Sequence, residues 1–153
     1  MTVSAKSPSE STTEMNQIVL PPHTNALGTA FGGTVMAWVD ICAAMTAQRH
    51  ARSAVVTASM EAVDFIAPIR LGNLVNLQAT VDYVGRTSMV VGVRVHAEDP
   101  ATGDRAHAAN AHVTFVALGA DGVPLEVPRL LLDSPEAQER HDLAQRIRAR
   151  RHR

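Results

Sequence analysis

The sequence has few of the residues from which several common kinds of site are built. Cys42 is its only cysteine, so one chain can form neither an internal disulfide nor a cysteine-based zinc site, and a reducing compartment, the cytoplasm, is expected. No run approaches the ~18 consecutive apolar residues of a membrane span, and residues 1–14 lack the apolar core of a signal peptide. The formal net charge of -1 supplies no overall field for nucleic acid or an anionic membrane. We expect neither as a partner.

The composition is that of a globular protein with one domain. The chain has 153 residues, of which 46% are hydrophobic and 19% charged, enough to bury a substantial core. Residues 1–14 are rich in Ser, Thr, Pro and charge, which predicts a flexible leader. Ser134-Pro135-Glu136 place a cap, an N1 proline and an acid in the order of a helix start. We therefore divide the chain into the leader, a domain over residues 15–128, and a tail with a helix over residues 129–153.

A long helix is predicted over residues 34–50. The segment contains no glycine or proline and ends in Arg49 and His50, whose charge suits the C-terminal end of a helix dipole. Its apolar side chains point in nearly every direction, which is typical of a helix buried on all sides. The glycine-containing loop HTNALGTAFGG precedes it, so we expect the helix to begin near Gly33. One carboxylate, Asp40, lies within the apolar run.

Most of the other apolar segments predict strands, because apolar and polar residues alternate in them or β-branched residues are frequent. These strands cover residues 16–20, 53–65, 73–84, 88–99 and 105–118. We expect the last four to form an antiparallel meander, curved around the central helix in an α+β fold. One such sheet cannot cover a helix that is apolar on all sides. We therefore expect a second copy to pack alongside it, in at least a homodimer.

The acid in the helix suggests a catalytic group. An isolated carboxylate is costly to bury, so Asp40 should face a polar pocket, pair with a base, or be held ready for proton transfer. It lies on the same face of the helix as Gly33, about 10 Å along the axis. Gly28, Gly32 and Gly33 would let a ligand approach the free N–H groups at the helix start, which can polarise a carbonyl oxygen. At that distance, the N–H groups at the helix start and Asp40 of the same chain cannot act on one carbonyl group. A two-fold partner could instead bring its own Asp40 near this helix start.

A structural role for Asp40 is about as well supported by the sequence alone. The carboxylate could accept a hydrogen bond from the hydroxyl of Thr34 or Thr57 and only fix the helix. Asn25, in the glycine loop, could position a water molecule through its amide, although asparagine in loops more often shapes a turn.

Other kinds of catalytic site find little support. Cys42 has no histidine partner evident in the sequence, and no GxSxG motif of a serine hydrolase is present. His107 and His112 are an odd number of residues apart on a predicted strand, which puts them on opposite faces. We therefore expect no metal site.

Several motifs together resemble a known family. HTNALGTAFGG, VMAWVD, VVTASMEAVDFIAP, IRLGN and VGRTSM are similar to the hotdog-fold acyl-CoA thioesterases of the YciA and brain acyl-CoA hydrolase type, over about residues 15–128. The resemblance implies a hotdog fold, in which a curved antiparallel sheet wraps around a long central helix. It also implies hydrolysis of acyl-CoA thioesters without a cofactor, since coenzyme A is part of the substrate. The implied assembly is a homodimer, further assembled as a trimer of dimers.

The resemblance also implies which residues form the site. Asn25 of one subunit and Asp40 of the other would act together across the dimer interface, with the amide of Gly33 as oxyanion donor. Thr57 would support the acid or the water, or be an ordinary strand residue. Asp40 would either activate a water molecule or attack the thioester itself through a mixed anhydride. The pantetheine or phosphates of coenzyme A would contact one turn, made of Gly85, Arg86, Thr87 and Ser88.

Two other functions are compatible with the same fold. A hotdog acyl-CoA hydratase or dehydratase would use a histidine with a carboxylate, and the only histidine near the glycine loop is His23, which lacks placement on the helix face. A domain that binds acyl-CoA without turnover would be a sensor. The presence of both Asn25 and Asp40 argues against a sensor.

Overall fold

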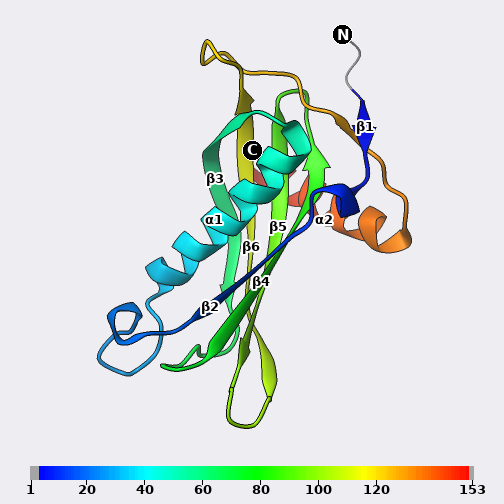
Figure 1. Ribbon diagram of the computed structural model, residues 1–153. Helices are drawn as coiled ribbons and strands as arrows, with labels where there is room; N and C mark the ends of the chain where they lie inside the picture. The colour runs from blue at the N-terminus through cyan, green and yellow to red at the C-terminus, as the bar shows by residue number, and fades with distance from the viewer. Residues whose placement is uncertain (1–3, 152–153) are drawn as a thin grey trace.

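A computed structural model describes residues 4–151 of the chain (Figure 1). The elements in chain order are β1 (Ala5–Lys6), η1 (Pro8–Glu10), β2 (Thr13–Ile18), η2 (Pro21–His23), α1 (Gly32–Ala51), β3 (Ala54–Phe65), β4 (Leu74–Val84), β5 (Ser88–Glu98), β6 (Arg105–Leu118), β7 (Arg129–Leu130) and α2 (Pro135–Arg151). Both predicted helices and all five predicted strands are present, and their ends differ from the prediction by only a few residues. The α+β class is confirmed. Neither helix in the described part of the chain combines the length and the hydropathy of a membrane span.

The main sheet has five strands in the order β2-β4-β5-β6-β3. The strands β4, β5 and β6 form the predicted meander, but the prediction that β3 belongs to it in sequence order is wrong. β3 pairs antiparallel with β6, with Thr57 opposite Phe115, and so forms the far edge of the sheet. The connection from β3 to β4 is long enough to cross the end of the sheet (Figure 1). Strand periodicity fixes the faces of each strand but not the order of the strands.

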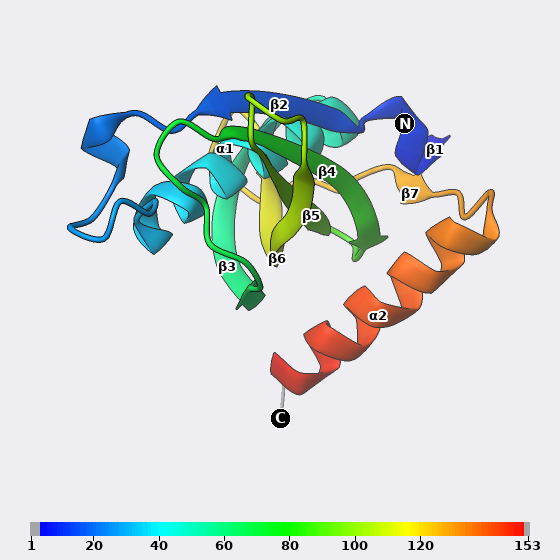
Figure 2. The same ribbon diagram turned by 90° about the horizontal axis from the view of Figure 1, so that it is seen from below.

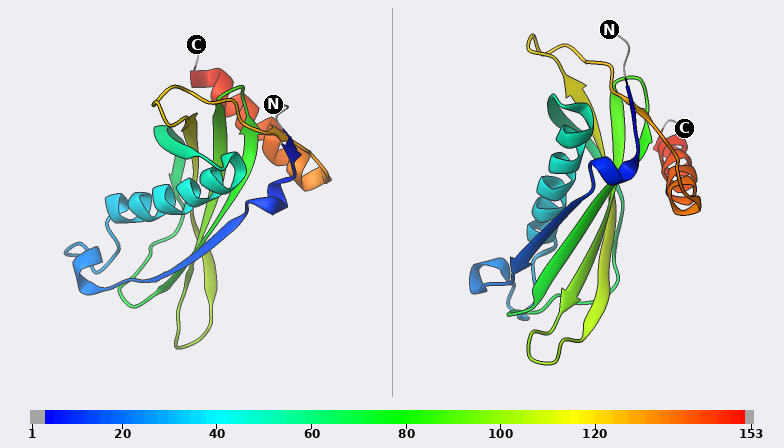
Figure 3. Two further views of the ribbon diagram at one scale, coloured as in Figure 1. Left: turned by 45° about the horizontal axis from the view of Figure 1, so that its top comes forward. Right: turned by 45° about the vertical axis from the view of Figure 1, so that its right-hand side comes forward.

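The sheet curves around α1, as predicted. α1 contacts all five strands on one face, and α2 lies on the opposite face (Figures 2 and 3). Alternate residues of β4 and β5 point toward α1, as their apolar–polar alternation predicts. The exception is Tyr83, which the alternation places on the inner face with Val81; a register shift after Val81 turns its ring outward against His141 of α2, so the prediction is wrong there. The fully buried core includes Cys42 and Ala43 from α1 and Leu77, Met89 and Phe115 from the sheet.

The prediction that α1 is buried on all sides is wrong for a single chain. Gly33, Ala37 and Ile41 lie exposed along one side of the helix, and Ile41 is 52% exposed. The physical reason is that one sheet can cover only one side of a helix. The apolar residues on the other side need a different cover, which agrees with the expectation of a second copy.

The segment predicted as a flexible leader (1–14) is ordered from residue 4 onward, so this prediction is wrong there. β1 pairs parallel with β7, which is far along the chain. Lys6 Nζ donates hydrogen bonds to the carbonyl oxygens of Arg49 (3.3 Å) and His50 (3.0 Å), at the C-terminal end of α1. The lysine therefore satisfies carbonyls that the helix leaves unpaired. The polar composition of the segment gives no sign of these long-range contacts. Residues 1–3 lie outside the described part of the chain.

The C-terminal segment is part of the same folded unit rather than a tail. α2 begins at Pro135 as predicted, and Ser134 Oγ accepts a hydrogen bond from Ala137 N (3.1 Å). The helix packs on the outer face of the sheet, where Arg148 Nη1 donates to Tyr83 Oη (2.8 Å). Its buried side chains are Ala137, Ala144 and Ile147. The predicted boundary at residue 128 therefore does not separate a domain from a free segment.

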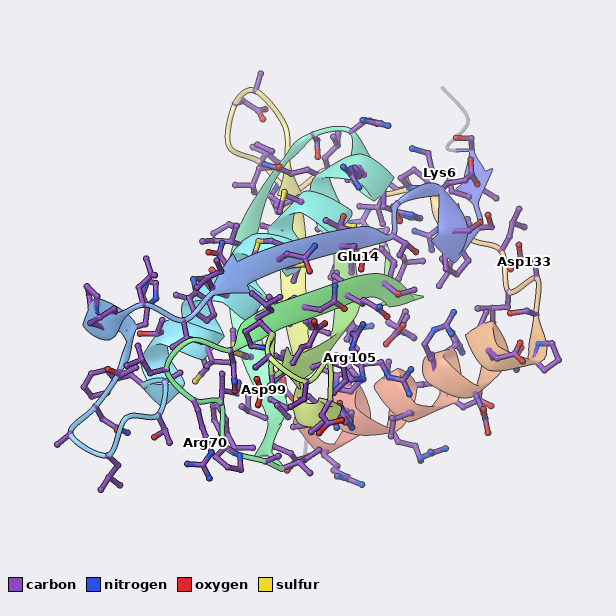
Figure 4. All side chains as sticks on the ribbon, turned by 60° about the horizontal axis from the view of Figure 1, so that its bottom comes forward. Lys6, Glu14, Arg70, Asp99, Arg105 and Asp133 are labelled. Atoms are coloured by element: carbon purple, nitrogen blue, oxygen red, sulfur yellow. The ribbon has the colours of Figure 1, made fainter. Side chains whose placement is uncertain are left out.

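The outer face also carries a polar network beyond α2. Asn76 Nδ2 donates to Glu14 Oε1 (2.6 Å) and to Asn16 Oδ1 (3.0 Å), and Arg105 Nη2 donates to Asn76 Oδ1 (3.2 Å). Asn76 thus bridges β2 and β6 through Glu14 and Arg105, which are labelled in Figure 4. These hydrogen bonds allow Asn76 to be buried without unpaired polar atoms on its amide.

Asp82 on β4 is the only buried carboxylate among the described residues, with 4% of its surface exposed. Arg140 Nε lies 3.4 Å from its Oδ1, and His112 Nε2 lies 3.8 Å from its Oδ2. Burial under α2 raises the pKa of Asp82 to about 7, although the charge of Arg140 opposes the shift. Gly92 is required opposite this side chain, because a Cβ there would overlap the carboxylate.

As the pH rises from about 4 to about 7, the stability of the wild type should fall relative to that of the Asp82→Asn variant. The pKa of the carboxyl is 3.8 in its reference state and about 7 when folded. The folded state therefore binds more protons than the unfolded state between these values, and unfolding free energy decreases with pH there, by up to about 4 kcal/mol. Urea unfolding of both proteins at one concentration, from about pH 4 to about pH 8, measures the difference.

The exposed residue Glu139 on the same helix provides the control. The Glu139→Gln variant should follow the wild type at a nearly constant offset. If the curves for wild type and Asp82→Asn run parallel across the whole range, the raised pKa of Asp82 is wrong.

Candidate active site

Asp40 lies on the side of α1 that the sheet leaves uncovered. It is half-buried, so the prediction of a carboxylate inside the core is wrong for a single chain. Thr57 Oγ1 on β3 donates a hydrogen bond to Asp40 Oδ1 (2.8 Å), which makes Thr57 the partner rather than Thr34. The other oxygen, Oδ2, makes no hydrogen bond to any residue in the described part of the chain. One carboxylate oxygen is thus held in place, while the other has no hydrogen-bond partner among the described residues and can accept a proton.

The start of α1 presents free backbone donors. The helix begins at Gly32, one residue before the predicted start, and the amides of Thr34 and Val35 both donate to Phe31 O (3.0 and 3.1 Å). Within residues 4–151, the amides of Gly32 and Gly33 find no acceptor, as expected for the first residues of a helix. A Cβ on Gly33 would meet nothing within 4 Å, so the approach is open. A carbonyl oxygen could bind here at the positive end of the helix.

Asn25 shapes the loop before the helix. Its Oδ1 accepts hydrogen bonds from Leu27 N (2.9 Å) and Thr29 N (3.2 Å), and its Nδ2 donates to Thr29 Oγ1 (2.9 Å). This is an Asx turn, in which the side chain stands in for a backbone group. No hydrogen bond joins Asn25 to Asp40 in the described residues of one chain. One chain therefore does not join the two side chains by a hydrogen bond.

The turn from Gly85 to Ser88 connects β4 and β5 at the opposite end of the sheet from the start of α1 (Figure 1). Gly85 N donates to Ser88 O (2.8 Å), and Arg129 Nη2 donates to Gly85 O (2.7 Å). Arg86 is exposed, and Thr87 is half-buried. One chain therefore does not bring this turn to Asp40 or to the helix start.

The surroundings of Cys42 and His23 do not favour a catalytic role. Burial raises the pKa of Cys42 to about 11, so the thiol stays protonated at neutral pH and cannot act as a nucleophile. His23 Nδ1 accepts a hydrogen bond from Leu20 N (2.9 Å), and its ring packs edge-on against Trp38. Within the described residues, no three His, Cys, Asp or Glu side chains are grouped so as to hold a metal ion.

Sequence reasoning missed two contributors near the helix start. Thr29 holds the side chain of Asn25, and the ring of Phe65 lies over Gly32. The separation of Asn25 and Thr29 within a glycine loop was the available signal for the first. The position of Phe65 depends on where β3 ends relative to α1, which no local pattern encodes.

Comparison with known proteins identifies the family. Residues 27–103 match the profile of the thioesterase superfamily. The chain belongs to the thioesterase superfamily. It is 43% identical to YkhA of Bacillus subtilis, named as an uncharacterized acyl-CoA thioester hydrolase, over 88% of this chain and 79% of that protein. The predicted resemblance to hotdog acyl-CoA thioesterases is confirmed.

Solved structures of the superfamily extend the similarity to nearly the whole chain. A hexameric acyl-CoA thioesterase without ligand superposes with a TM-score of 0.93 at 40% identity, covering 97% of this chain and 96% of that one. The acyl-CoA hydrolase of Staphylococcus aureus, solved with butyryl-CoA, coenzyme A and coenzyme A disulfide, superposes with a TM-score of 0.90 at 40% identity, covering 96% and 90%. These matches also bear out the hotdog fold.

The Staphylococcus aureus hydrolase has also been solved as three single alanine variants, at an asparagine, an aspartate and a threonine. The three positions follow one another in the same order and at the same chain separations as Asn25, Asp40 and Thr57.

Proposed function

We propose that this protein hydrolyses acyl-CoA thioesters to a free acid and coenzyme A, using Asp40 as the group that activates the attack. The observation that carries the proposal is the Asp40 carboxylate, which Thr57 holds by one oxygen while the other is free. It lies on the uncovered side of a helix whose first amides have no acceptor. Membership of the thioesterase superfamily and the hydrolases among its relatives support the same reaction.

The chemistry follows from these two features. The thioester carbonyl oxygen accepts hydrogen bonds from the amides of Gly32 and Gly33, which stabilise the negative charge that develops on it. In one route Asp40 takes a proton from water, whose oxygen bonds to the carbonyl carbon. In the other, Asp40 attacks that carbon itself and forms a mixed anhydride, which water then hydrolyses. In both routes the carbon–sulfur bond breaks, and the sulfur leaves as the thiolate of coenzyme A and is protonated.

The site is completed between two subunits. Gly33 and Asp40 are about 10 Å apart along α1, which is too far for one carbonyl group. A two-fold partner would place its Asp40 near the glycine loop that carries Asn25, and the exposed side of α1 around Ile41 is the surface to be covered. The hexameric neighbour supports a homo-oligomer, and we propose a trimer of dimers.

We also propose that the turn formed by Gly85, Arg86, Thr87 and Ser88 contacts the coenzyme A part of the substrate. The substrate would be bound at a site that this subunit shares with a neighbouring subunit. Arg86 is exposed at its tip, and a guanidinium group suits phosphate recognition. No cofactor is needed, because the carboxylate and the amides supply the whole reaction. A cytoplasmic location agrees with the single, buried cysteine.

The alternative hydratase or dehydratase is less well supported. Such an enzyme would use a histidine together with a carboxylate, but His23 lies in η2 rather than on α1 and has no carboxylate partner among the described residues. The sensor alternative would leave the free oxygen of Asp40 without a use.

Thiol release from a panel of acyl-CoAs tests the proposal. We expect release of coenzyme A with a kcat on the order of 10 s⁻¹ on at least one substrate. Enoyl-CoAs in the same panel report hydration through loss of their absorbance. Tight acyl-CoA binding without thiol release would contradict hydrolysis and favour the sensor, and hydration without thiol release would favour the hydratase.

A further inference from the structure

A cavity of about 430 Å³ opens beside the start of α1. It is lined by the loop before the helix and by the connection from β3 to β4. Both segments lie toward the lower left of Figure 1. Its volume falls within the range of small-ligand pockets. Apart from Thr29, its walls are glycine, alanine, proline and larger apolar side chains, chiefly Val35, Phe65, Ile66 and Ile69.

The cavity adjoins the proposed oxyanion donors. Gly32 is one of the residues that line it. A Cβ built on Gly32 would lie 3.5 Å from Cζ of Phe65, so the aromatic ring covers the first residue of the helix. A carbonyl group bound to the amides of Gly32 and Gly33 would therefore have the Phe65 ring and the cavity directly at its side.

We propose that this cavity takes the acyl chain of the substrate and that Phe65 determines the chain length accepted. The inference rests on the proposed thioester hydrolysis. A thioester carbonyl fixed at the helix start has two substituents, the acyl chain and the pantetheine arm. Pantetheine carries amide groups that would lose hydrogen bonds to water where they pack against this lining, which offers mainly apolar surface. Burial against this surface stabilises a bound alkyl chain.

Phe65 is the wall whose size can change without a cost to the core. Val35 and Ile69 are 2% and 4% exposed and belong to the packed core, so they form a fixed floor. Phe65 is 53% exposed at the end of β3. The backbone behind it is held, because Ile66 N and Ala67 N both donate to Ala108 O (2.8 and 3.3 Å). Substitution should therefore change the width of the cavity while the backbone keeps its path.

The test is kcat/KM for straight-chain acyl-CoAs from acetyl to lauroyl, measured on wild type, Phe65→Ala and Phe65→Trp. Phe65→Ala should raise the ratio of kcat/KM for long over short chains by about tenfold or more, and Phe65→Trp should lower that ratio. The reason is that one methylene that fits or fails to fit an apolar pocket changes kcat/KM by roughly 10- to 200-fold. Phe31→Ala is the matched control. Phe31 is 50% exposed at the same end of α1 but does not line the cavity, so the chain-length profile should keep its shape.

The outcomes separate the two proposals. Hydrolysis by all four proteins with profiles of the same shape would overturn the acyl-chain assignment and leave the proposed function in place. A uniform change in KM at every chain length in Phe65→Ala would also overturn it, because pantetheine would then occupy the cavity. Absence of hydrolysis by the wild type on every chain would overturn the proposed function and this inference with it. Circular dichroism of each variant confirms that the fold is kept.

Discussion

The Asp40→Asn variant should lose between about a hundredfold and ten-thousandfold in kcat, the usual contribution of a positioned general base. Asparagine has nearly the same shape as aspartate and can still accept the hydrogen bond from Thr57 Oγ1, so the helix and the strand should keep their positions. It can neither take a proton nor form an anhydride. KM should change little, because the substrate is bound by the helix amides and the coenzyme A contacts rather than by this carboxylate.

Steady-state thiol release on the best acyl-CoA, with thermal unfolding of each protein, measures this effect. Asp104→Asn removes the same charge from an exposed position at the tip of the hairpin between β5 and β6, and should leave kcat within about twofold, as is usual for surface substitutions. Turnover by Asp40→Asn at a similar level to that control would sink the assignment of Asp40.

The two chemical routes differ in what is attached to the chain during turnover. In the anhydride route the acyl group is bonded to Asp40 before water arrives, whereas in the general-base route no covalent adduct forms. Rapid acid quench during the first turnover, followed by mass measurement of the intact chain, separates them. An added acyl mass indicates the anhydride, and an unmodified chain indicates activated water.

Much of the local structure could be predicted from the sequence because short-range physics determines it. The alternation in β4 and β5 predicts the buried positions of Val75, Leu77 and Val91 and fails only past the register shift after Val81. The Ser134-Pro135 start of α2 was also correct, because capping involves groups only a few residues apart. Elements and faces therefore follow from local patterns.

The errors concern contacts between distant parts of the chain. The N-terminal segment is held by β7 and by Lys6 on the carbonyl end of α1, neither of which its own composition reveals. The place of β3 beside β6 likewise depends on a connection that crosses the sheet. Apolar residues do lie on nearly all sides of α1, as the pattern indicates. The pattern does not tell whether each side is covered by the same chain or by a second one.

The same distinction applies to the site. From the sequence, Thr34 and Thr57 were both available as partners of Asp40. The structure selects Thr57 because β3, as the edge strand, lies next to the uncovered side of α1. Asn25 was assigned by resemblance to a role across two subunits, and within one chain its amide is used to build its own loop. How the two half-sites meet is therefore a property of the assembly.

Two inactive variants, Asn25→Asp and Asp40→Asn, should together recover about a quarter of wild-type activity when they assemble with each other, because a two-fold interface uses both halves of each subunit. Each homodimer carries one defect in both of its sites. A heterodimer carries both defects in one site and none in the other. Random assembly makes half of the dimers mixed, and each mixed dimer has one intact site out of two. Asn25→Asp is chosen because its carboxylate keeps the acceptor for Leu27 N and Thr29 N, so the loop retains its turn while the amide donor is lost.

Co-expression of the two variants with different affinity tags, followed by purification on both, isolates the mixed dimers for thiol-release assays. Because one site of two is intact in each mixed dimer, activity should rise from about a quarter of the wild-type value before purification to about half of it afterwards. Pairing Asp40→Asn with a double variant that carries both substitutions gives the matched control, since no site in that assembly combines an intact Asn25 with an intact Asp40. A site built inside one chain predicts a different result, because every site in the mixed dimer would then contain one defect. Mixed dimers as inactive as their parents would therefore contradict a site shared between subunits, and recovery only in the first pair would place Asn25 and Asp40 in one site from two chains.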